Sequence, residues 1–202
     1  MISIPVNLAI EDELSEAVLR RLLRDARRGY SVGTAYGRSG NGYLRRTIAG
    51  WNRAARGIPF VVLTDLDNAD CPPSLVNSWL TLPKHPNLLF RVAVREVETW
   101  LLSDTIHFAK YLSCPVQQMP GDPEALADPK RALVDLARKS RSSEIRARVV
   151  PKGGSTAKQG PDYNACLSTF VRESWNVVDA AARSPSLMRT VTRLRQFSPT
   201  WP

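Results

Sequence analysis

Residues 59–67 read PFVVLTDLD, and the class of the fold follows from this segment. Its first half is continuously apolar and rich in β-branched side chains, which is typical of a strand buried on both faces of a parallel sheet. Its second half ends in Asp65-Leu66-Asp67. If the chain is still extended there, both aspartates point to one side and Leu66 points back to the core. We therefore expect a buried strand that presents two carboxylates at its end.

Strands and helices alternate on both sides of this segment. Short apolar runs predict three further strands, at residues 4–10, 30–36 and 88–94. Apolar spacing with cap and stop signals predicts helices between Asp12 and Gly29 and at residues 43–56, 75–80 and 97–112. Alternation of this kind implies βαβ units, so we expect an α/β fold with a mostly parallel four-stranded sheet flanked by helices.

The pattern changes after residue 112. Four prolines, at positions 115, 120, 123 and 129, punctuate a loop-rich connection. Helices are predicted beyond it at residues 130–139, 162–174 and 186–195. We therefore expect an α/β domain at residues 1–112 and a loop-rich helical extension at residues 113–202 that packs on it.

Basic residues are unevenly distributed along the chain of 202 residues, whose net charge is +9. Ten arginines and one acid lie in residues 20–56, and nine basic residues against three acids lie in residues 128–158. Two basic zones around an acidic motif favour a polyanionic partner, although such runs also serve only to solubilise helix faces. The candidates for nucleic-acid contact are Arg38, Arg45, Arg46, Lys152 and Lys158.

Some classes of protein are disfavoured by composition. No apolar run approaches the roughly 20 residues that span a bilayer, so we expect no membrane association. The first residues read as a strand rather than a signal peptide. Cys71, Cys114 and Cys166 lie far apart and offer no zinc-binding spacing, so a reducing, cytoplasmic location is expected.

Acidic residues follow three of the predicted strands. Glu11 follows the first, Asp65 and Asp67 end the third, and Glu96 and Glu98 follow the fourth. Ligands bind at the carboxyl ends of strands in parallel sheets, and carboxylate oxygens suit Mg²⁺ or Mn²⁺. The alternative is that these acids cap turns and helices. If a helix has begun at residue 96, only one of the two glutamates can reach the site.

Two of these segments resemble motifs of a known family. Residues 8–13, LAIEDE, resemble the first Toprim motif, a hydrophobic strand that ends in a glutamate. Residues 61–67, VVLTDLD, resemble the Toprim DxD motif, and the resemblance covers roughly residues 1–112. Two positions depart from the family pattern: Asp12 stands where glycine is frequent, and Ala69 stands where topoisomerase-type motifs have a third aspartate.

Three other segments are similar to one group within this family. They are residues 91–102, RVAVREVETWLL, and, more loosely, residues 151–154, PKGG, and 160–164, GPDYN. The group consists of compact Toprim-like, OLD-nuclease-like proteins of bacterial defence operons, which commonly accompany an ABC- or SMC-type ATPase. The resemblance thus implies a nucleic-acid substrate, an ATPase partner and a role in anti-phage defence.

The resemblance also implies residue roles. A Toprim nuclease would use Glu11, Asp65, Asp67 and Glu98 in catalysis, and would hold Mg²⁺ or Mn²⁺ with Glu11, Asp65, Asp67 and Glu96. Hydrolysis of phosphodiester bonds is the favoured reaction, since a second domain with a nucleophilic tyrosine and a zinc module are both missing from the pattern. The alternative is a non-catalytic subunit that binds the ATPase and nucleic acid.

Overall fold

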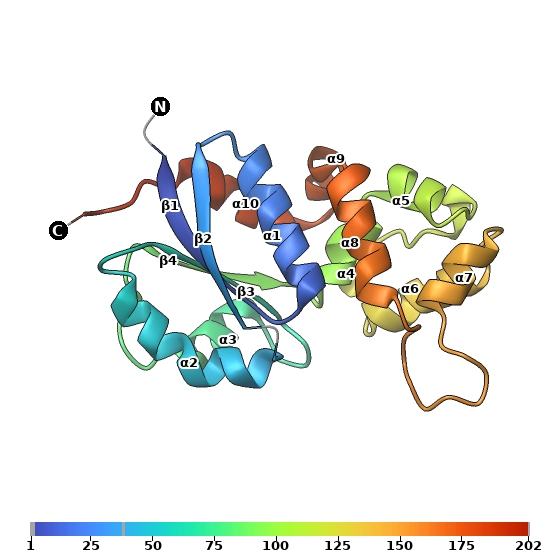
Figure 1. Cartoon of the computed structure of the whole chain (residues 1–202), viewed down its shortest axis with the longest axis horizontal. Helices are drawn as coiled ribbons and strands as arrows, with labels where there is room; N and C mark the ends of the chain where they lie inside the picture. Colours follow the sequence, from blue (N-terminus) through green and yellow to red (C-terminus); the bar gives the residue numbers. More distant parts are fainter. Residues whose placement is uncertain (1–2, 38, 202) are drawn as a thin grey trace.

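The predicted strand around residue 62 lies inside a parallel sheet. The computed structural model describes residues 3–37 and 39–201, and Figure 1 shows its arrangement. Among these residues four strands form one sheet in the order β2-β1-β3-β4, and all three pairings are parallel. The strands are β1 (Ile4–Ile10), β2 (Tyr30–Gly37), β3 (Phe60–Asp65) and β4 (Leu88–Ala93). The expected α/β class with a four-stranded sheet flanked by helices is confirmed.

Helices cover both faces of the sheet, because side chains along β3 alternate between two cores. Val61 and Leu63 belong to the larger core, which includes α1 (Glu13–Asp25). Phe60 and Val62 belong to the smaller core, beneath α2 (Asn41–Ala54) and α3 (Pro72–Trp79). Figure 1 shows α1 and α10 (Pro185–Gln196) on one side of the sheet and α2 and α3 on the other.

One predicted helix is divided in two. Residues 97–112 were expected to form a single helix, but α4 (Val97–Ser103) ends before Asp104 and α5 (Thr105–Tyr111) begins after it. The backbone of Asp104 leaves the helical region at φ −83° and ψ 70°, and its Oδ1 accepts a hydrogen bond from the His107 amide at 3.4 Å. An aspartate that caps a new helix competes with continuation of the old one.

The segment after residue 112 is helical, as expected. Its elements are two short 3₁₀ turns, η1 (Val116–Gln118) and η2 (Pro123–Ala125), then α6 (Pro129–Arg138), α7 (Ser143–Val149), α8 (Tyr163–Glu173), α9 (Val177–Arg183) and α10 (Pro185–Gln196). The short helices α7 and α9 were not predicted, because seven residues carry too little periodicity.

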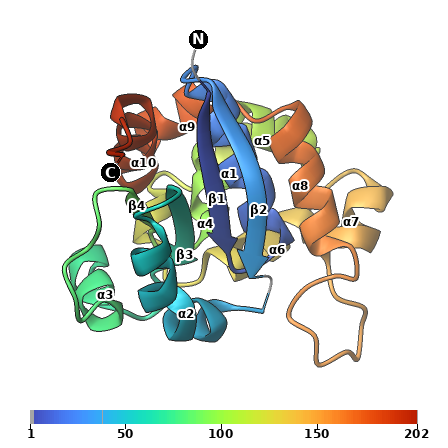
Figure 2. The ribbon, with the colours of Figure 1, turned by 60° about the vertical axis from the view of Figure 1, so that its left-hand side comes forward.

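These helices share the larger core with the sheet. Arg21 of α1 donates hydrogen bonds to the carbonyl oxygens of Val171 and Trp175, at 2.8 and 2.6 Å. In this way α8 is held against α1, and Figure 2 shows α10 returning to the β4 side of the sheet. The division into domains at residue 112 stays a prediction. None of the helices in residues 3–37 and 39–201 has the length and apolar character needed to cross a membrane.

Candidate metal centre

Glu11 lies one residue beyond β1 and is fixed against β3. Its Oε1 accepts a hydrogen bond from the Asp65 amide at 3.0 Å and another from the Thr64 hydroxyl. Burial raises the pKa of Glu11, and the two hydrogen bonds oppose that rise. Both bonds engage the same oxygen, and Oε2 accepts no hydrogen bond from the residues that the structure describes.

Asp65, Asp67 and Glu96 bring carboxylate oxygens within 4.8 Å of one another at the carboxyl end of the sheet. Asp65 is 8% exposed and accepts a hydrogen bond from the Val97 amide at 2.9 Å. Opposite oxygen ligands of Mg²⁺ are about 4.2 Å apart, since each lies about 2.1 Å from the ion. The group therefore needs only small shifts to hold such a cation.

Asp67 reaches this group by a different route from the one expected. An extended Asp65-Leu66-Asp67 was predicted, but β3 ends at Asp65 and Asp67 is left-handed, with φ 49°. Leu66 is buried in the smaller core, as predicted. The turn is held by Arg95, whose NH1 donates to the Asp67 carbonyl at 3.0 Å, and the Asp67 carboxylate accepts from Asn41 Nδ2 at 2.9 Å.

Lys130 of α6 contacts two members of the acidic group, Asp65 and Glu96, and was not predicted. Its Nζ lies 3.4 Å from Asp65 Oδ2, 3.3 Å from Glu96 Oε1 and 4.0 Å from Glu98 Oε2. Burial is the largest influence on the Lys130 pKa and lowers it, but the three carboxylates together raise this pKa above its ordinary value. A positive charge thus stands where a divalent cation would contact Asp65 and Glu96.

A sequence signal for Lys130 exists, although a weak one. The residue lies in the first turn of α6, directly after Pro129, where the helix dipole disfavours a cation. A lysine at such a position indicates a nearby negative charge. That charge includes Glu96, whose Oε2 also accepts a hydrogen bond from the Lys130 amide at 3.0 Å.

Glu96 and Glu98 diverge because α4 begins between them. Glu96 is the extended residue that precedes α4 and belongs to the group of three, whereas Glu98 lies in the first helical turn and is 1% exposed. Tyr163 of α8 donates its hydroxyl to Glu98 Oε1 at 3.1 Å. Burial raises the pKa of Glu98 to about 7, with Lys130 opposing the rise and Glu96 adding to it. Glu98 therefore lies outside the group of three carboxylates and contacts Lys130 instead.

A cleft of about 870 Å³ opens beside the carboxylates. Asp67, Glu96 and Lys130 line one part of it. Acidic and basic side chains alternate over the rest, where Arg131 and Arg138 pair with Asp135 and Lys158 adds a further cation. Lys158 is thus placed to meet an anionic polymer at the acidic group.

The residues predicted to contact nucleic acid lie at different places. Lys158 lines this cleft, whereas Lys152 is exposed on the same loop. Arg45 and Arg46 are exposed on α2. Arg38 lies outside the described residues. Their roles in binding stay predictions.

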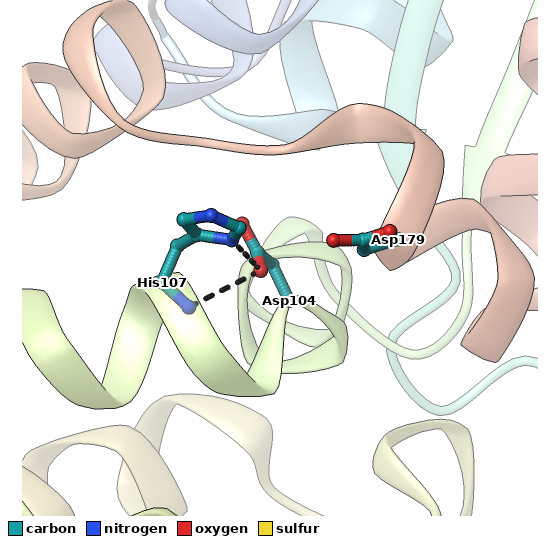
Figure 3. Close-up of side chains that lie close together, drawn as sticks. All are labelled: Asp104, His107 and Asp179. Atoms are coloured by element: carbon teal, nitrogen blue, oxygen red, sulfur yellow. Dashed lines mark hydrogen bonds and ion pairs between the residues drawn. The ribbon is translucent and has the colours of Figure 1, made fainter.

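A second group with ligand atoms within 4.8 Å of one another consists of Asp104, His107 and Asp179, shown in Figure 3. Asp104 Oδ1 accepts from His107 Nδ1 at 2.8 Å, and its Oδ2 accepts from the Asn176 amide at 2.7 Å. Asp179 accepts from Asn176 Nδ2 at 2.7 Å. The contacts cap α5 and tie it to the start of α9, which accounts for the group without a metal.

The comparisons with known proteins give one structural likeness. No family model matches the sequence, and no curated protein sequence matches it. The chain is similar in structure to the C-terminal region of the Burkholderia pseudomallei OLD protein. The TM-score is 0.51, the identity is 14%, and the match covers 94% of this chain and 96% of that one. A likeness at this identity shows the fold, and it agrees with the OLD-like part of the resemblance in the sequence.

Proposed function

We propose that the chain is a Toprim-type nuclease that hydrolyses phosphodiester bonds with Mg²⁺ or Mn²⁺. The observation that carries this proposal is the convergence of Asp65, Asp67 and Glu96, at the carboxyl end of a parallel sheet, around a cationic centre. The same fold in an OLD protein, whose family the sequence motifs resemble, supports it.

The residues of the cleft suggest a division of roles. Asp65, Asp67 and Glu96 would hold the metal, together with Oε2 of Glu11, which lies outside the group of three. The metal would supply charge neutralisation and an activated water when bound. Glu11 would also accept a proton from that water. Lys130, displaced from the carboxylates, would turn its charge toward the phosphate, and Lys158 would orient the polymer. Glu98 would position Lys130 through its contact with the ammonium group.

The wider setting is part of the proposal. By resemblance, the chain would act in the cytoplasm as the effector of a bacterial anti-phage system and would work with an ABC- or SMC-type ATPase. The helical segment after residue 112 would provide the surface that binds the ATPase. Cleavage is therefore measured both with the lone chain and beside the ATPase.

A second candidate function has a specific observation in its favour. Because the Lys130 ammonium already neutralises Asp65 and Glu96, the fold does not need a metal to be electrostatically satisfied. A subunit that binds the ATPase and nucleic acid without cutting would look the same in this respect. Only a measurement of cleavage separates the two.

The decisive experiment compares wild type with Asp67→Asn, which keeps the shape and removes the charge. Cleavage of single-stranded DNA, duplex DNA and structured RNA is measured with Mg²⁺, Mn²⁺ or EDTA, with and without the ATPase. Asp70→Asn is the matched control, because Asp70 is exposed and outside the group. We expect metal-dependent cleavage by wild type and the control but not by Asp67→Asn. Proteins that bind the ATPase and never cut would support the second candidate.

A further inference from the structure

A group of cations lies at the β4 edge of the sheet, away from the acidic cleft. Its members, here called the edge cation group, are Lys84, Arg91, Arg189 and Arg193. β4 is the outermost strand on its side, and α10 packs beside it, as Figure 2 shows. Arg91 extends from the middle of β4 toward α10, where its Nε donates to Thr190 Oγ1 at 3.3 Å. Arg189 and Arg193 are exposed on the neighbouring turns of α10.

These four side chains carry like charges that repel one another. Among residues 3–37 and 39–201, no ion pair joins any of them to a carboxylate. Burial lowers the pKa of Arg91 to about 10, with Arg193 and Arg189 adding to the effect. Desolvation also lowers the pKa of Lys84, and Arg193 and Arg91 lower it further. The charges of Arg91 and Lys84 are therefore disfavoured both by burial and by the neighbouring arginines.

Arg91 is the member that most needs a partner. It is partly buried, and its two terminal nitrogens donate no hydrogen bond to a described residue. Two arginines elsewhere in the chain are paired, since Arg21 contacts Asp25 at 2.8 Å and Arg138 contacts Asp135 at 2.7 Å. A desolvated, unpaired guanidinium is costly, and a planar fork of this kind matches the oxygens of a phosphate.

Two members of the edge cation group, Arg189 and Arg193, follow one another along α10, which runs beside β4. The Ser186 hydroxyl near the start of α10 accepts from the Val94 amide at 3.4 Å, just past the carboxyl end of β4. The chain after α10 meets Asn87 at the amino end of β4, where Asn87 Nδ2 donates to the Thr200 carbonyl at 2.8 Å. α10 thus runs back along β4, away from the acidic cleft. Arg189 and Arg193 are separated by about 6 Å along its axis.

That spacing suits a repeating anion. A nucleic-acid strand carries one phosphate per nucleotide, so two arginines about 6 Å apart along α10 can contact neighbouring phosphates of one strand. Repeated contacts along a line fit a polymer better than a single small anion.

We propose that the edge cation group binds the phosphate backbone of nucleic acid as an anchoring site separate from the acidic cleft. The inference goes beyond the proposed nuclease and rests on it only for the kind of polymer. It predicts that nucleic acid runs from the cleft along the β4 edge.

The test measures binding rather than cleavage. Fluorescence anisotropy of a labelled 20-base-pair duplex and of one of its strands is followed in EDTA at several KCl concentrations, using the full chain. The test variant is Arg189→Gln with Arg193→Gln. The matched control is Arg172→Gln with Arg195→Gln, which removes the same charge from exposed positions on α8 and on another side of α10. Melting curves check that both are folded, and Arg91→Gln provides an independent third variant.

We expect the test variant to bind about tenfold more weakly at low salt. The slope of log affinity against log salt should fall by about 1.8 for the duplex and about 1.4 for the strand, because each lost phosphate contact contributes about 0.9 or 0.7. The control should keep the wild-type slope, and Arg91→Gln should lower it. Equal slopes for test and control variants would overturn the proposal.

Gel filtration and lipid vesicles distinguish nucleic-acid binding from two different roles of the same charges. A charged edge strand can serve only to prevent edge-to-edge association. If the test variant dimerises in gel filtration while binding nucleic acid normally, the edge cation group keeps the chain monomeric and the proposal fails. Binding of wild type to anionic lipid vesicles but not to nucleic acid would also overturn it.

The anchoring site and the nuclease can fail separately. Asp67→Asn should retain the full salt slope, because Asp67 lies in the acidic cleft and not at the β4 edge. A reduced slope in the test variant without any wild-type cleavage would keep the anchoring site and remove the nuclease.

Discussion

The ammonium of Lys130 lies 3.4 Å from Oδ2 of Asp65, in the position where a divalent cation would contact the same carboxylate. Both residues have limited contact with water, since the Lys130 side chain is 32% exposed and that of Asp65 is 10% exposed. The lysine and a bound metal would therefore compete for one set of oxygens. The ammonium neutralises carboxylates that otherwise repel one another, and it would lower the apparent affinity of the site for a metal.

Lys130→Met should separate these two effects. Without the ammonium, Asp65, Glu96 and Glu98 repel one another, so we expect the metal-free variant to lose about 2 kcal/mol of unfolding free energy, a reduced value for a partly exposed pair. Mg²⁺ should then raise the melting temperature more than it does in wild type. Lys139→Met, an exposed lysine at the other end of α6, is the control. Equal stability of the two variants in EDTA would contradict the role given to Lys130.

Two substitutions of Asp67 should separate the effect of its charge from the effect of its backbone conformation. Its left-handed conformation suits asparagine, whereas alanine in that region costs about 1 kcal/mol. We expect Asp67→Asn to unfold at the wild-type urea midpoint in EDTA and Asp67→Ala at a lower one. In Mg²⁺, both should lose the stabilisation that wild type gains. If both variants have the wild-type urea midpoint in EDTA, the left-handed conformation at Asp67 costs no free energy. That result would favour the extended conformation predicted from the sequence.

The pH dependence of stability should report on Glu98. Its pKa is about 7 in the folded protein and near 4.5 when unfolded, so its full contribution is present below pH 4.5 and is lost as pH rises toward 7. In EDTA, the contribution of Glu98 to the unfolding free energy of wild type should fall across this window by no more than about 3 kcal/mol, in addition to the contribution of Glu11, whose pKa is also raised. Glu98→Gln can still accept from Tyr163 and should show a flatter profile. Glu173→Gln, at an exposed position, should keep the wild-type profile.

The sequence was sufficient to predict the sheet and the residues that lie at its carboxyl end. The apolar run at residues 60–63 suits a strand buried on both faces. Strand ends meet at one edge in any parallel sheet, so Glu11 lies beside Asp65 as the pattern implied. The role of Lys130 was not predicted, because its partners Glu96 and Asp65 lie 34 and 65 residues away in the sequence. The local spacing of residues does not indicate such contacts. Asp67 was placed on the correct side but in the wrong conformation, since the turn depends on Arg95 from another segment.

Among the positions of β2, Gly37 should lose the most stability when a side chain is added. Its φ is 116°, and a Cβ there would lie 2.0 Å from the carbonyl oxygen of Ile10, the residue directly before Glu11. Gly37→Ala combines backbone strain with displacement of β1, so we expect a loss of about 3 kcal/mol in urea unfolding. Because β1 carries Glu11, Mg²⁺ should also stabilise the variant less than wild type. Gly50→Ala, in the exposed middle of α2 with nothing near its Cβ, should instead gain about 0.5 kcal/mol from helix propensity. Similar melting temperatures for the two alanine variants would show that β1 and β2 are not packed as closely as the structure has them.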